Sequence, residues 1–484
     1  MRHTSLIQIC VRKATVCQRA ALRYFKSACE RDHDAPARRV SLSRIRVRSF
    51  QVRMRLFQVR VRATLVPARH GSSRQFPARE ATGPARPTVL ILSASMGSGH
   101  DVIAAELVRR LAAEGVDAEV VDILDLLPLR LGTALRGWYS WMMRSAPWLY
   151  ALIYQIFFVP GRAPSVSPLT IVIAARLRRF VGSRQVAEVV STFHVAAQAA
   201  GHLRWHGRLL VPSTVLLTDF AAHRLWLHPG NDRYLCPDLA TAHVVHTATG
   251  CPVSCHAPVV RLGFRRPGPG VTPIVRPDPG RPESGAVPAV HSDLGRTESG
   301  AAPAVRPEPR PGIGTASMRS RIGARAGDRL VLVSAGAWGV GGVEETARVL
   351  ARSGRYLPVI LCGHNRELRR RLRHTGIALG WCDDMPGLMA AAYALVDNAA
   401  GVTCREAMAA GVPVVSYRPI PGHGQDGARA MARAGLSVYA RDTGELLAAL
   451  DRFGHGEERD RQVARGAALF ALSPAESFLV PPGL

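Results

Sequence analysis

Two long stretches of the chain alternate short apolar runs with amphipathic helical patterns. The first opens with a buried strand at residues 88–94, followed by a Gly-rich loop and an amphipathic helix over 101–115. A strand in AEVVDIL completes a βαβ unit, and further strands are predicted at 186–191 and 213–219. This order predicts a parallel sheet covered by helices.

The second stretch begins at RLVLVSAG, residues 329–336, and repeats the same alternation. Its later strands are predicted at residues 357–363, 377–381, 394–398 and 412–417, and its helices at 365–375, 385–392 and 401–410. The predicted fold class is therefore α/β, with two doubly wound, Rossmann-like domains that face a cleft. Clefts between domains are common ligand sites.

Changes in composition divide the 484 residues into five segments. These are a basic extension (1–86), an N-terminal Rossmann-like domain (87–264), a linker (265–328), a C-terminal Rossmann-like domain (329–456) and a tail or helix (457–484). The linker is rich in Pro, Gly and Arg, and VRPDPGRPESGAVPA is followed there by the similar VHSDLGRTESGAAPA. Such a segment cannot bury enough apolar area to offset the entropy lost on ordering, so we expect a flexible linker or insertion.

The net charge of +27 is concentrated in the extension. Residues 1–86 hold 20 Lys and Arg against four acidic residues, which accounts for +16 of the total. One interpretation is an arm that binds nucleic acid or anionic lipid, because phosphates attract clustered arginines. We favour a solvated, disordered extension or a start codon placed too early, and we expect no specific nucleic-acid partner. Residues 44–66 alternate like a strand but have no companion strands nearby.

Nine scattered cysteines and the lack of a signal-peptide pattern predict a reducing, cytoplasmic location. Cys236, Cys251, Cys255 and His256 offer possible zinc ligands, but their CxxxCH spacing lacks the paired CxxC of most zinc sites. We therefore expect no metal.

An aromatic region surrounds the uncharged stretch Ser145–Gly161, which Pro147 and Gln155 interrupt and which is too short for a confident membrane span. Its aromatic residues are Trp138, Tyr139, Trp141, Trp148, Tyr150, Tyr154, Phe157 and Phe158. Rings with polar edges favour the headgroup layer of a membrane, so the region is predicted to be an interfacial or ligand-binding helix. An aromatic subdomain core explains it equally well.

The motif SASMGSGH, residues 93–100, is a Gly-rich turn between the first strand and the first helix. Gly97 and Gly99 allow the backbone to approach a ligand, and the helix N-terminus offers N–H groups to negative charge. An imidazole titrates near neutral pH, so His100 is a candidate base for a hydroxyl proton. The alternative is a tight βα turn. Asp219, in TDFAAH, is a candidate partner in the cleft or a simple turn residue.

A second motif, VDNAAGVTCREAMAAGVPVV at 396–415, combines a strand, a turn and an Ala-rich helix. Backbone N–H groups around Gly401 and Thr403 can hold a diphosphate without a metal. Glu406, one turn inside the helix, can accept both hydroxyls of a ribose, although a Glu near a helix start is common for dipole reasons alone.

A third motif, PIPGHGQDGARA at 419–430, is predicted to be a loop. Its Pro and Gly residues would leave His423, Gln425 and Asp426 free to bind a sugar. The alternative is a surface turn.

Taken in order, SASxGxGH, LTDFxxHxLWxxPxxDxY, GWxDxM and GxTxxEAxxxGxPxxxYxPIPG resemble the monogalactosyldiacylglycerol synthase and processive diacylglycerol glucosyltransferase family, relatives of the peptidoglycan transferase that makes lipid II. The resemblance covers about 87–264 and 329–451. It implies a GT-B fold and transfer of a hexose from a UDP-sugar, used as co-substrate without a cofactor, to a diacylglycerol-like lipid with inversion. It also implies peripheral association with the inner face of the cell membrane.

The resemblance also assigns roles to individual positions. It implies that His100 is the base. The residues themselves add Asp219 as a second candidate catalytic residue, and Gly97, Gly99, Trp148 and Tyr150 as candidate acceptor-binding residues. The implied donor-binding residues are Gly336 and Gly339 in a hinge loop, Trp381, Cys382 and Met385 around uracil, Ala400, Gly401 and Thr403 at the diphosphate, and Glu406 at the ribose. The third motif adds His423, Gly424 and Gln425 as candidate donor-binding residues at the sugar.

The sequence departs from the family pattern at several donor positions. The family has a basic residue at the position of Asn398 and two glycines at the positions of Ala400 and Gly401. Its sugar loop reads PGQExxN, where this chain has His423 and Gly427. The sugar therefore stays open, as do two alternatives: a transferase acting on a natural product or cell-wall lipid, and a UDP-binding relative with weakened catalysis.

Overall fold

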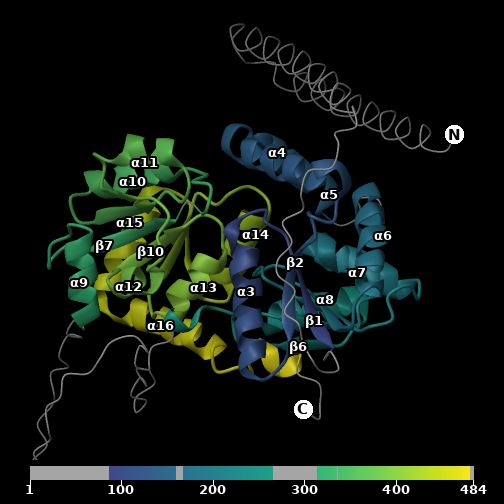
Figure 1. The fold of residues 1–484 in the computed structure, drawn as a ribbon. Coiled ribbons are helices and arrows are strands. Elements are labelled where there is room, and N and C mark those ends of the chain that lie inside the picture. The colour runs from purple at the N-terminus through teal and green to yellow at the C-terminus, as the bar shows by residue number, and fades with distance from the viewer. Residues whose placement is uncertain (1–86, 160–166, 265–312, 335, 480–484) are drawn as a thin grey trace, which may run out of the picture. The chain divides into compact units, whose positions relative to one another are not determined.

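The computed structural model describes residues 87–159, 167–264, 313–334 and 336–479, which fall within one compact unit, Gly83–Leu484. The basic extension, the strand-like residues 44–66 and the repeats lie outside the described residues. Two parallel sheets, each with helices on its faces, dominate the fold (Figure 1). We call them the N-terminal lobe and the C-terminal lobe.

The N-terminal lobe is built on six parallel strands in the order β2-β1-β3-β4-β5-β6. They are β1 (Thr88–Ser93), β2 (Ala118–Asp122), β3 (Val186–Ser191), β4 (Ser213–Leu216), β5 (Arg233–Cys236) and β6 (Val253–Cys255). Its helices are α3 (Ser98–Ala113), α4 (Leu131–Ser145), α5 (Pro147–Phe157), α6 (Pro168–Gly182), α7 (His194–Trp205) and α8 (Leu239–Thr249), with 3-10 turns η1 (Pro128–Arg130), η2 (Arg224–Trp226) and η3 (Leu262–Phe264).

Side-chain alternation in β1 explains why this sheet is covered on both faces. Leu90 and Leu92 join one core with α6 and α7, whereas Val89 and Ile91 join another core with α3. The four central positions, Val89 to Leu92, are all apolar because both faces are buried, as is typical of parallel sheets. Strand order reverses between β1 and β3, and ligands bind at such a switch point in open α/β sheets.

The C-terminal lobe has the strand order β12-β11-β10-β7-β8-β9, with its switch point between β7 and β10. Its strands are β7 (Leu330–Ser334), β8 (Leu357–Leu361), β9 (Ile377–Leu379), β10 (Ala394–Asp397), β11 (Val414–Tyr417) and β12 (Val438–Ala440). Its helices are α9 (Ile313–Arg321), α10 (Val343–Arg352), α11 (Arg366–Leu372), α12 (Met385–Ala390), α13 (Val402–Ala409), α14 (His423–Arg433) and α15 (Thr443–Arg452), followed by η4 (Phe453–His455). The prediction of two doubly wound α/β sheets is confirmed.

The end of the described chain returns to the N-terminal lobe. After α16 (Glu457–Leu469), Pro474 pairs with Ala257 beyond β6, and η5 (Ala475–Phe478) follows. Ala475 and Leu479 are buried in the core that contains Val89 and Ile91. The segment expected as a tail therefore completes the first lobe.

Three local expectations differ from the structure. Helix α3 begins at Ser98, so Gly99 and His100 lie in its first turn and not in a loop. Residues 419–430, expected as a loop, contain the first turns of α14. Part of the expected linker forms α9, which packs on the C-terminal lobe through the buried Met318.

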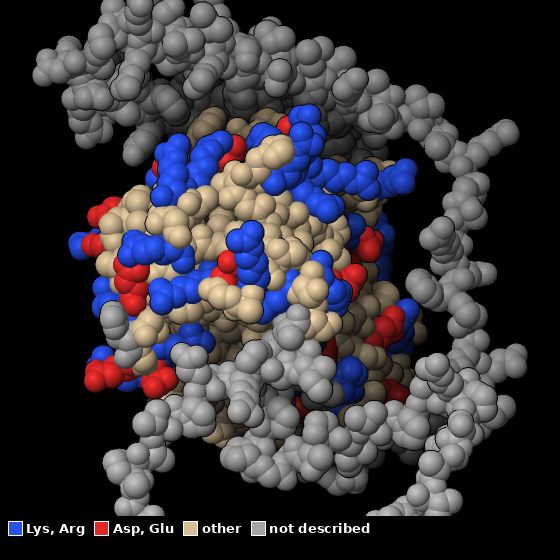
Figure 2. Space-filling view, turned by 90° about the vertical axis from the view of Figure 1, so that its left-hand side faces the viewer, with Lys and Arg blue, Asp and Glu red and all other residues tan. Residues whose placement is uncertain are grey.

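Charges are interspersed on the face shown in Figure 2, where acidic side chains lie among the basic ones. Among the described residues, exposed ion pairs join Arg348 to Glu344 on α10 and Arg370 to Glu367 on α11. Exposed pairs of this kind add little stability, because water and salt screen them. The mixture of acidic and basic side chains on this face does not support a uniformly basic surface that binds nucleic acid.

Candidate active site

His100 lies at the switch point of the N-terminal lobe, in the first turn of α3 after β1. Its Nδ1 is 2.9 Å from the backbone oxygen of Thr192, which directly follows β3, and 3.1 Å from Oγ1 of Thr218. A carbonyl oxygen can only accept, which assigns the proton of the neutral ring to Nδ1. Nε2 is then left unprotonated, as a general base requires.

Three further histidines surround this position. His194 begins α7, His223 follows β4, and His423 begins α14 in the other lobe. Burial lowers the pKa of all three imidazoles, and the charge of His100 lowers each of them further. The pKa of His223 falls to about 3. These neighbours are therefore neutral near pH 7.

Asp219 is close to this cluster but makes no hydrogen bond to His100 among the described residues. Its Oδ2 accepts a 2.8 Å hydrogen bond from Nε1 of Trp226 and lies 3.7 Å from Nε2 of His223. Its charge raises the pKa of His194 and His423, partly offsetting their burial. Asp219 thus accepts a hydrogen bond from Trp226 and affects the pKa of nearby histidines, and its role as a second candidate catalytic residue stays a prediction.

Two tyrosines of α5 contact α14 across the lobes. The hydroxyl of Tyr150 is 2.5 Å from Nδ1 of His423, and that of Tyr154 donates to Oδ2 of Asp426 at 2.8 Å. Gly422 is required here, because a Cβ at this position would lie 2.7 Å from Cγ of Tyr154. The side chains of His423 and Asp426, expected to be free for a sugar, are thus already engaged.

The aromatic region divides into a buried and an exposed set. Tyr150 and Tyr154 are buried with Met142 and Met143, which favours the core interpretation for this half. Trp148, the other predicted acceptor residue, is 56% exposed. Tyr150 is therefore not open to an acceptor in this structure, whereas Trp148 is.

The two Gly-rich turns bring the lobes close together. Gly97 has a φ of 149°, which favours glycine, and it precedes the first residue of α3. A Cβ on Gly99 would lie 3.8 Å from Cγ1 of Val402, the first residue of α13. The N-terminal turns of α3 and α13 therefore approach each other, and both present backbone N–H groups.

The turn before α13 is organised by Asp397, whose Oδ2 accepts hydrogen bonds from the backbone N–H groups of Ala399 (2.8 Å) and Ala400 (2.6 Å). Ala400 has a φ of +52°, a left-handed conformation that strains a residue with a Cβ. Gly401 is the N-cap of α13, and Thr403 lies in its first turn. The turn therefore has the expected strand–turn–helix form, and its role at a diphosphate stays a prediction.

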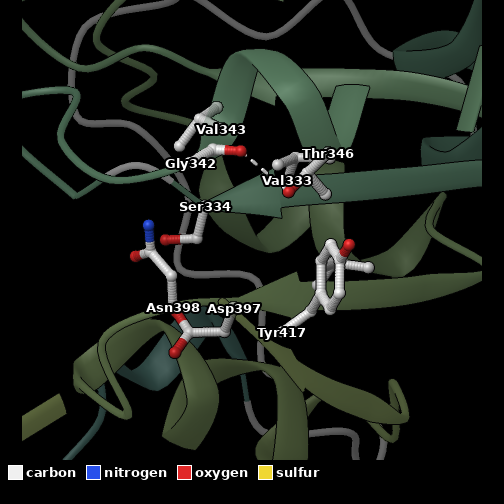
Figure 3. A pocket seen from close by; sticks show the side chains of 9 residues that line it. Val333, Ser334, Gly342, Val343, Thr346, Asp397, Asn398 and Tyr417 are labelled. Atoms are coloured by element: carbon white, nitrogen blue, oxygen red, sulfur yellow. Dashed lines mark hydrogen bonds between the residues drawn. The ribbon is translucent and has the colours of Figure 1, made fainter. Parts of the chain in front are cut away.

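A pocket lies at the switch point of the C-terminal lobe, between the ends of β7 and β10 (Figure 3). It is lined by Val333, Ser334, Gly342, Val343, Thr346, Val396, Asp397, Asn398 and Tyr417. Asn398 donates to the carbonyl of Val340 at 3.0 Å, while its buried Oδ1 has no hydrogen-bond partner among the described residues. Asn398 thus anchors the glycine loop after β7.

The loop after β7 places Gly336 and Gly339 at φ values of 61° and 60°. A Cβ on Gly339 would lie 2.6 Å from Cβ of Asn365, whose side chain donates to the Gly339 carbonyl at 3.2 Å. The predicted hinge loop is therefore tied to the segment after β8.

Of the residues predicted around uracil, Trp381 and Cys382 lie between β9 and α12, and Met385 is the first residue of α12. The Trp381 ring stacks on His364 with centroids 4.6 Å apart and an interplanar angle of 6°. No sequence motif pointed to His364. Cys382 and Met385 pack against the core of the lobe.

Glu406 is buried and contacts the other lobe. Its Oε1 is 3.1 Å from Nη2 of Arg261, which lies just after the last strand of the N-terminal lobe. Burial raises the pKa of this carboxyl, and Arg261 partly offsets that rise. In this structure the Glu406 carboxylate is paired with Arg261, and its role as the ribose carboxylate stays a prediction.

The cysteines proposed as zinc ligands are free thiols. Burial raises the pKa of Cys236, Cys251 and Cys255, which opposes the thiolate form that a metal needs. Within the described residues, no group of three or more His, Cys, Asp or Glu is arranged to hold a metal ion.

Comparisons with known proteins identify relatives of the chain. Residues 100–250 match the family model described as monogalactosyldiacylglycerol synthase. A processive diacylglycerol beta-glucosyltransferase from Bacillus cereus is 24% identical over 386 residues, covering 75% of this chain and 84% of the relative, and one from Bacillus mycoides is equally similar. A crystal structure of MurG from Acinetobacter baumannii is 13% identical with a TM-score of 0.45, covering 82% of this chain and 98% of that one. The chain is therefore similar to the monogalactosyldiacylglycerol synthase and processive diacylglycerol glucosyltransferase family, as its motifs indicated.

Proposed function

We propose that this protein is a hexosyltransferase that moves a hexose from a UDP-sugar to a diacylglycerol-like lipid at a membrane surface. The observation that carries the proposal is that the helix turn containing His100 lies close to the N-terminal turn of α13. The carbonyl of Thr192 sets the tautomer of His100. The names of the relatives, diacylglycerol glucosyltransferases, support the same donor and acceptor classes.

In this mechanism His100 takes the proton of the acceptor hydroxyl through Nε2. The hydroxyl oxygen then attacks the anomeric carbon from the face opposite the diphosphate, so the configuration inverts. The bond from the anomeric carbon to the diphosphate oxygen breaks as the new bond forms. Backbone N–H groups at Gly401 and Thr403 stabilise the departing negative charge, which is the role a divalent cation plays in other transferases.

Exposed tryptophans on α4 and α5 support the membrane part of the proposal. Trp138, Trp141 and Trp148 are 41%, 42% and 56% exposed, and the exposed Arg144 lies between the last two in sequence. Amphipathic rings with neighbouring arginines suit the headgroup layer of an anionic membrane. No helix in the described part of the chain has the length and apolarity needed to cross a bilayer. We place the protein peripherally, at the inner face of the cell membrane.

The test is release of UDP when the protein is mixed with UDP-glucose or UDP-galactose and vesicles containing diacylglycerol. His100→Ala should lower the rate by roughly 10²- to 10⁴-fold while UDP binding persists. His206→Ala, a change at an exposed histidine of the same lobe, is the matched control. A wild-type rate in His100→Ala would refute the base assignment.

Two alternatives are separated by the same assay. A transferase for a natural product or cell-wall lipid would release UDP only with those acceptors and not with diacylglycerol vesicles. A UDP-binding relative with weakened catalysis, suggested by the departures at Asn398 and His423, would bind UDP but release none from either sugar nucleotide. Replacing Trp141 and Trp148 by Ala should lower sedimentation with vesicles if these rings contact the membrane.

A further inference from the structure

Arg405 is a buried cation without hydrogen-bond partners for either terminal nitrogen. It lies on α13 between Cys404 and Glu406, it is 3% exposed, and within the described residues Nη1 and Nη2 have no acceptor. A guanidinium stays protonated in proteins, so the charge remains when the side chain is buried. Leaving a buried charge unpaired is strongly destabilising, which makes this side chain unusual in a folded protein.

The surroundings of Arg405 do not supply the missing acceptor. Its Cζ lies 4.5 Å from the ring centroid of Phe220, which comes from the other lobe, and this contact is a cation–π interaction. The charges of Asp219 and Asp238 favour the protonated guanidinium, but neither carboxylate is within ion-pair distance. The adjacent Glu406 pairs with Arg261 and not with Arg405.

A second unpartnered polar atom is close to this guanidinium. Nε2 of the buried His256, which follows β6, also has no hydrogen-bond partner among the described residues. The charge of Arg405 contributes to lowering the pKa of His256, after burial. Nδ1 of His256 is 2.8 Å from the carbonyl oxygen of Ala257, so the neutral ring carries its proton there and Nε2 is an acceptor that cannot neutralise Arg405. The region therefore carries the uncompensated positive charge and unused donors of Arg405, and a negatively charged ligand would satisfy both.

The position of Arg405 on its helix indicates which ligand this is. In an α-helix the Cα–Cβ bond tilts towards the N-terminus, so a residue of the first turn extends its side chain over the start of the helix. The start of α13 is the Asp397–Gly401 turn, whose backbone N–H groups suit a diphosphate. A planar guanidinium binds phosphate oxygens in pairs, which backbone N–H groups alone do not.

We propose that Arg405 binds the diphosphate of the nucleotide sugar and neutralises the charge that develops there as the sugar leaves. This inference rests on the proposed function. Donor binding would supply the acceptor that both terminal nitrogens lack, so Arg405 destabilises the empty protein and stabilises the loaded one. If Arg405 had only a structural role through its contact with Phe220, it would stabilise the empty protein, and replacing it would lower the melting temperature.

The experiment compares the binding of UDP and of uridine by calorimetry at fixed ionic strength. Arg405→Met should weaken UDP binding by roughly 10- to 100-fold, leave uridine binding unchanged and raise the melting temperature of the empty protein. Arg405→Lys, which keeps the charge without the paired donors, should show a smaller loss. Arg433→Met, at an exposed arginine of α14, is the matched control and should change neither affinity.

The outcomes separate this inference from the proposed function. If wild type binds UDP and Arg405→Met binds it equally well, the role of Arg405 is refuted while the proposed function stands. An equal loss of UDP and uridine binding also refutes it, because the phosphates would then not be the contact. If wild type binds neither ligand, the proposed function fails and this inference with it. Should the Met variant not fold, an unchanged affinity for UDP in Arg405→Lys refutes the paired contact.

Discussion

The strained turn before α13 makes a prediction about two neighbouring residues, Ala400 and Gly427. Ala400 has a left-handed φ of +52°, which costs roughly 1–2 kcal/mol for a residue with a Cβ. Ala400→Gly relieves this strain, although the greater freedom of glycine in the unfolded chain removes about 0.4–1 kcal/mol of the gain. We therefore expect a net stabilisation of about 0.5–1 kcal/mol.

Gly427 is an interior residue of α14, where alanine would normally stabilise the helix by about 1 kcal/mol. Here a Cβ at position 427 would lie 2.8 Å from Cβ of Ala400, a separation that requires one of the two segments to move. Such overpacking costs about 1–3 kcal/mol, so Gly427→Ala alone should destabilise the protein by roughly 1 kcal/mol. In the Ala400→Gly background the obstructing atom is gone, and the same change should stabilise by about 1 kcal/mol.

The assay is a double-mutant cycle on the free energy of unfolding, measured by urea denaturation. The two substitutions should show a coupling energy of about 2 kcal/mol, with the double variant more stable than wild type. Additivity within about 0.5 kcal/mol would refute the reasoning, because it would mean that the two Cβ atoms do not compete for the same space. UDP binding by the double variant would then show whether relaxing this turn affects the donor site.

Three other predictions concern groups buried around the site. Burial lowers the pKa of His223 to about 3 and that of His256 to about 4, so below about pH 6.5 the unfolded chain takes up protons that the folded protein does not. The stability present above pH 6.5 should therefore be lost by roughly 1.4 kcal/mol per pH unit for each histidine. In thermal melts of His256→Asn, the melting temperature should fall less steeply with decreasing pH than in wild type. An equal slope in that variant would contradict the assignment. Arg261→Ala leaves the buried Glu406 carboxylate unpaired and should lower the melting temperature of the empty protein. UDP should raise the melting temperature of this variant by more than that of wild type, since a ribose no longer competes with the arginine for Glu406. An equal increase in both proteins would mean that Glu406 does not bind the ribose. Tyr154→Phe removes the donor to Asp426 and should cost about 1–2 kcal/mol in urea unfolding, and no loss would show that this contact between the lobes is not formed in solution.

The sequence alone determined the doubly wound architecture of both lobes. Strands such as Thr88–Ser93 and Leu330–Ser334 contain four consecutive apolar residues because both faces of a parallel sheet are covered, and such a run can be recognised in the sequence without the tertiary structure. The strands β5, β6 and β12 were not predicted, because RYLC, VSC and VYA each contain a single Val, Ile or Leu, whereas equally short strands that were predicted, such as ALVD of β10, contain at least two. The helical start of α14 was missed because its Pro and Gly residues indicate a turn whether or not a helix follows.

The motifs placed His100, Gly401 and Glu406 correctly at the ends of strands or the starts of helices, because each motif is local in sequence. Only the tertiary structure decided what these residues touch. The carbonyl that fixes the His100 proton lies 92 positions away, and Arg261 reaches Glu406 from the other lobe. The unpaired charge of Arg405 likewise exists only because the lobes bury it, and burial depends on contacts between segments distant in sequence, which no local pattern of residues can encode.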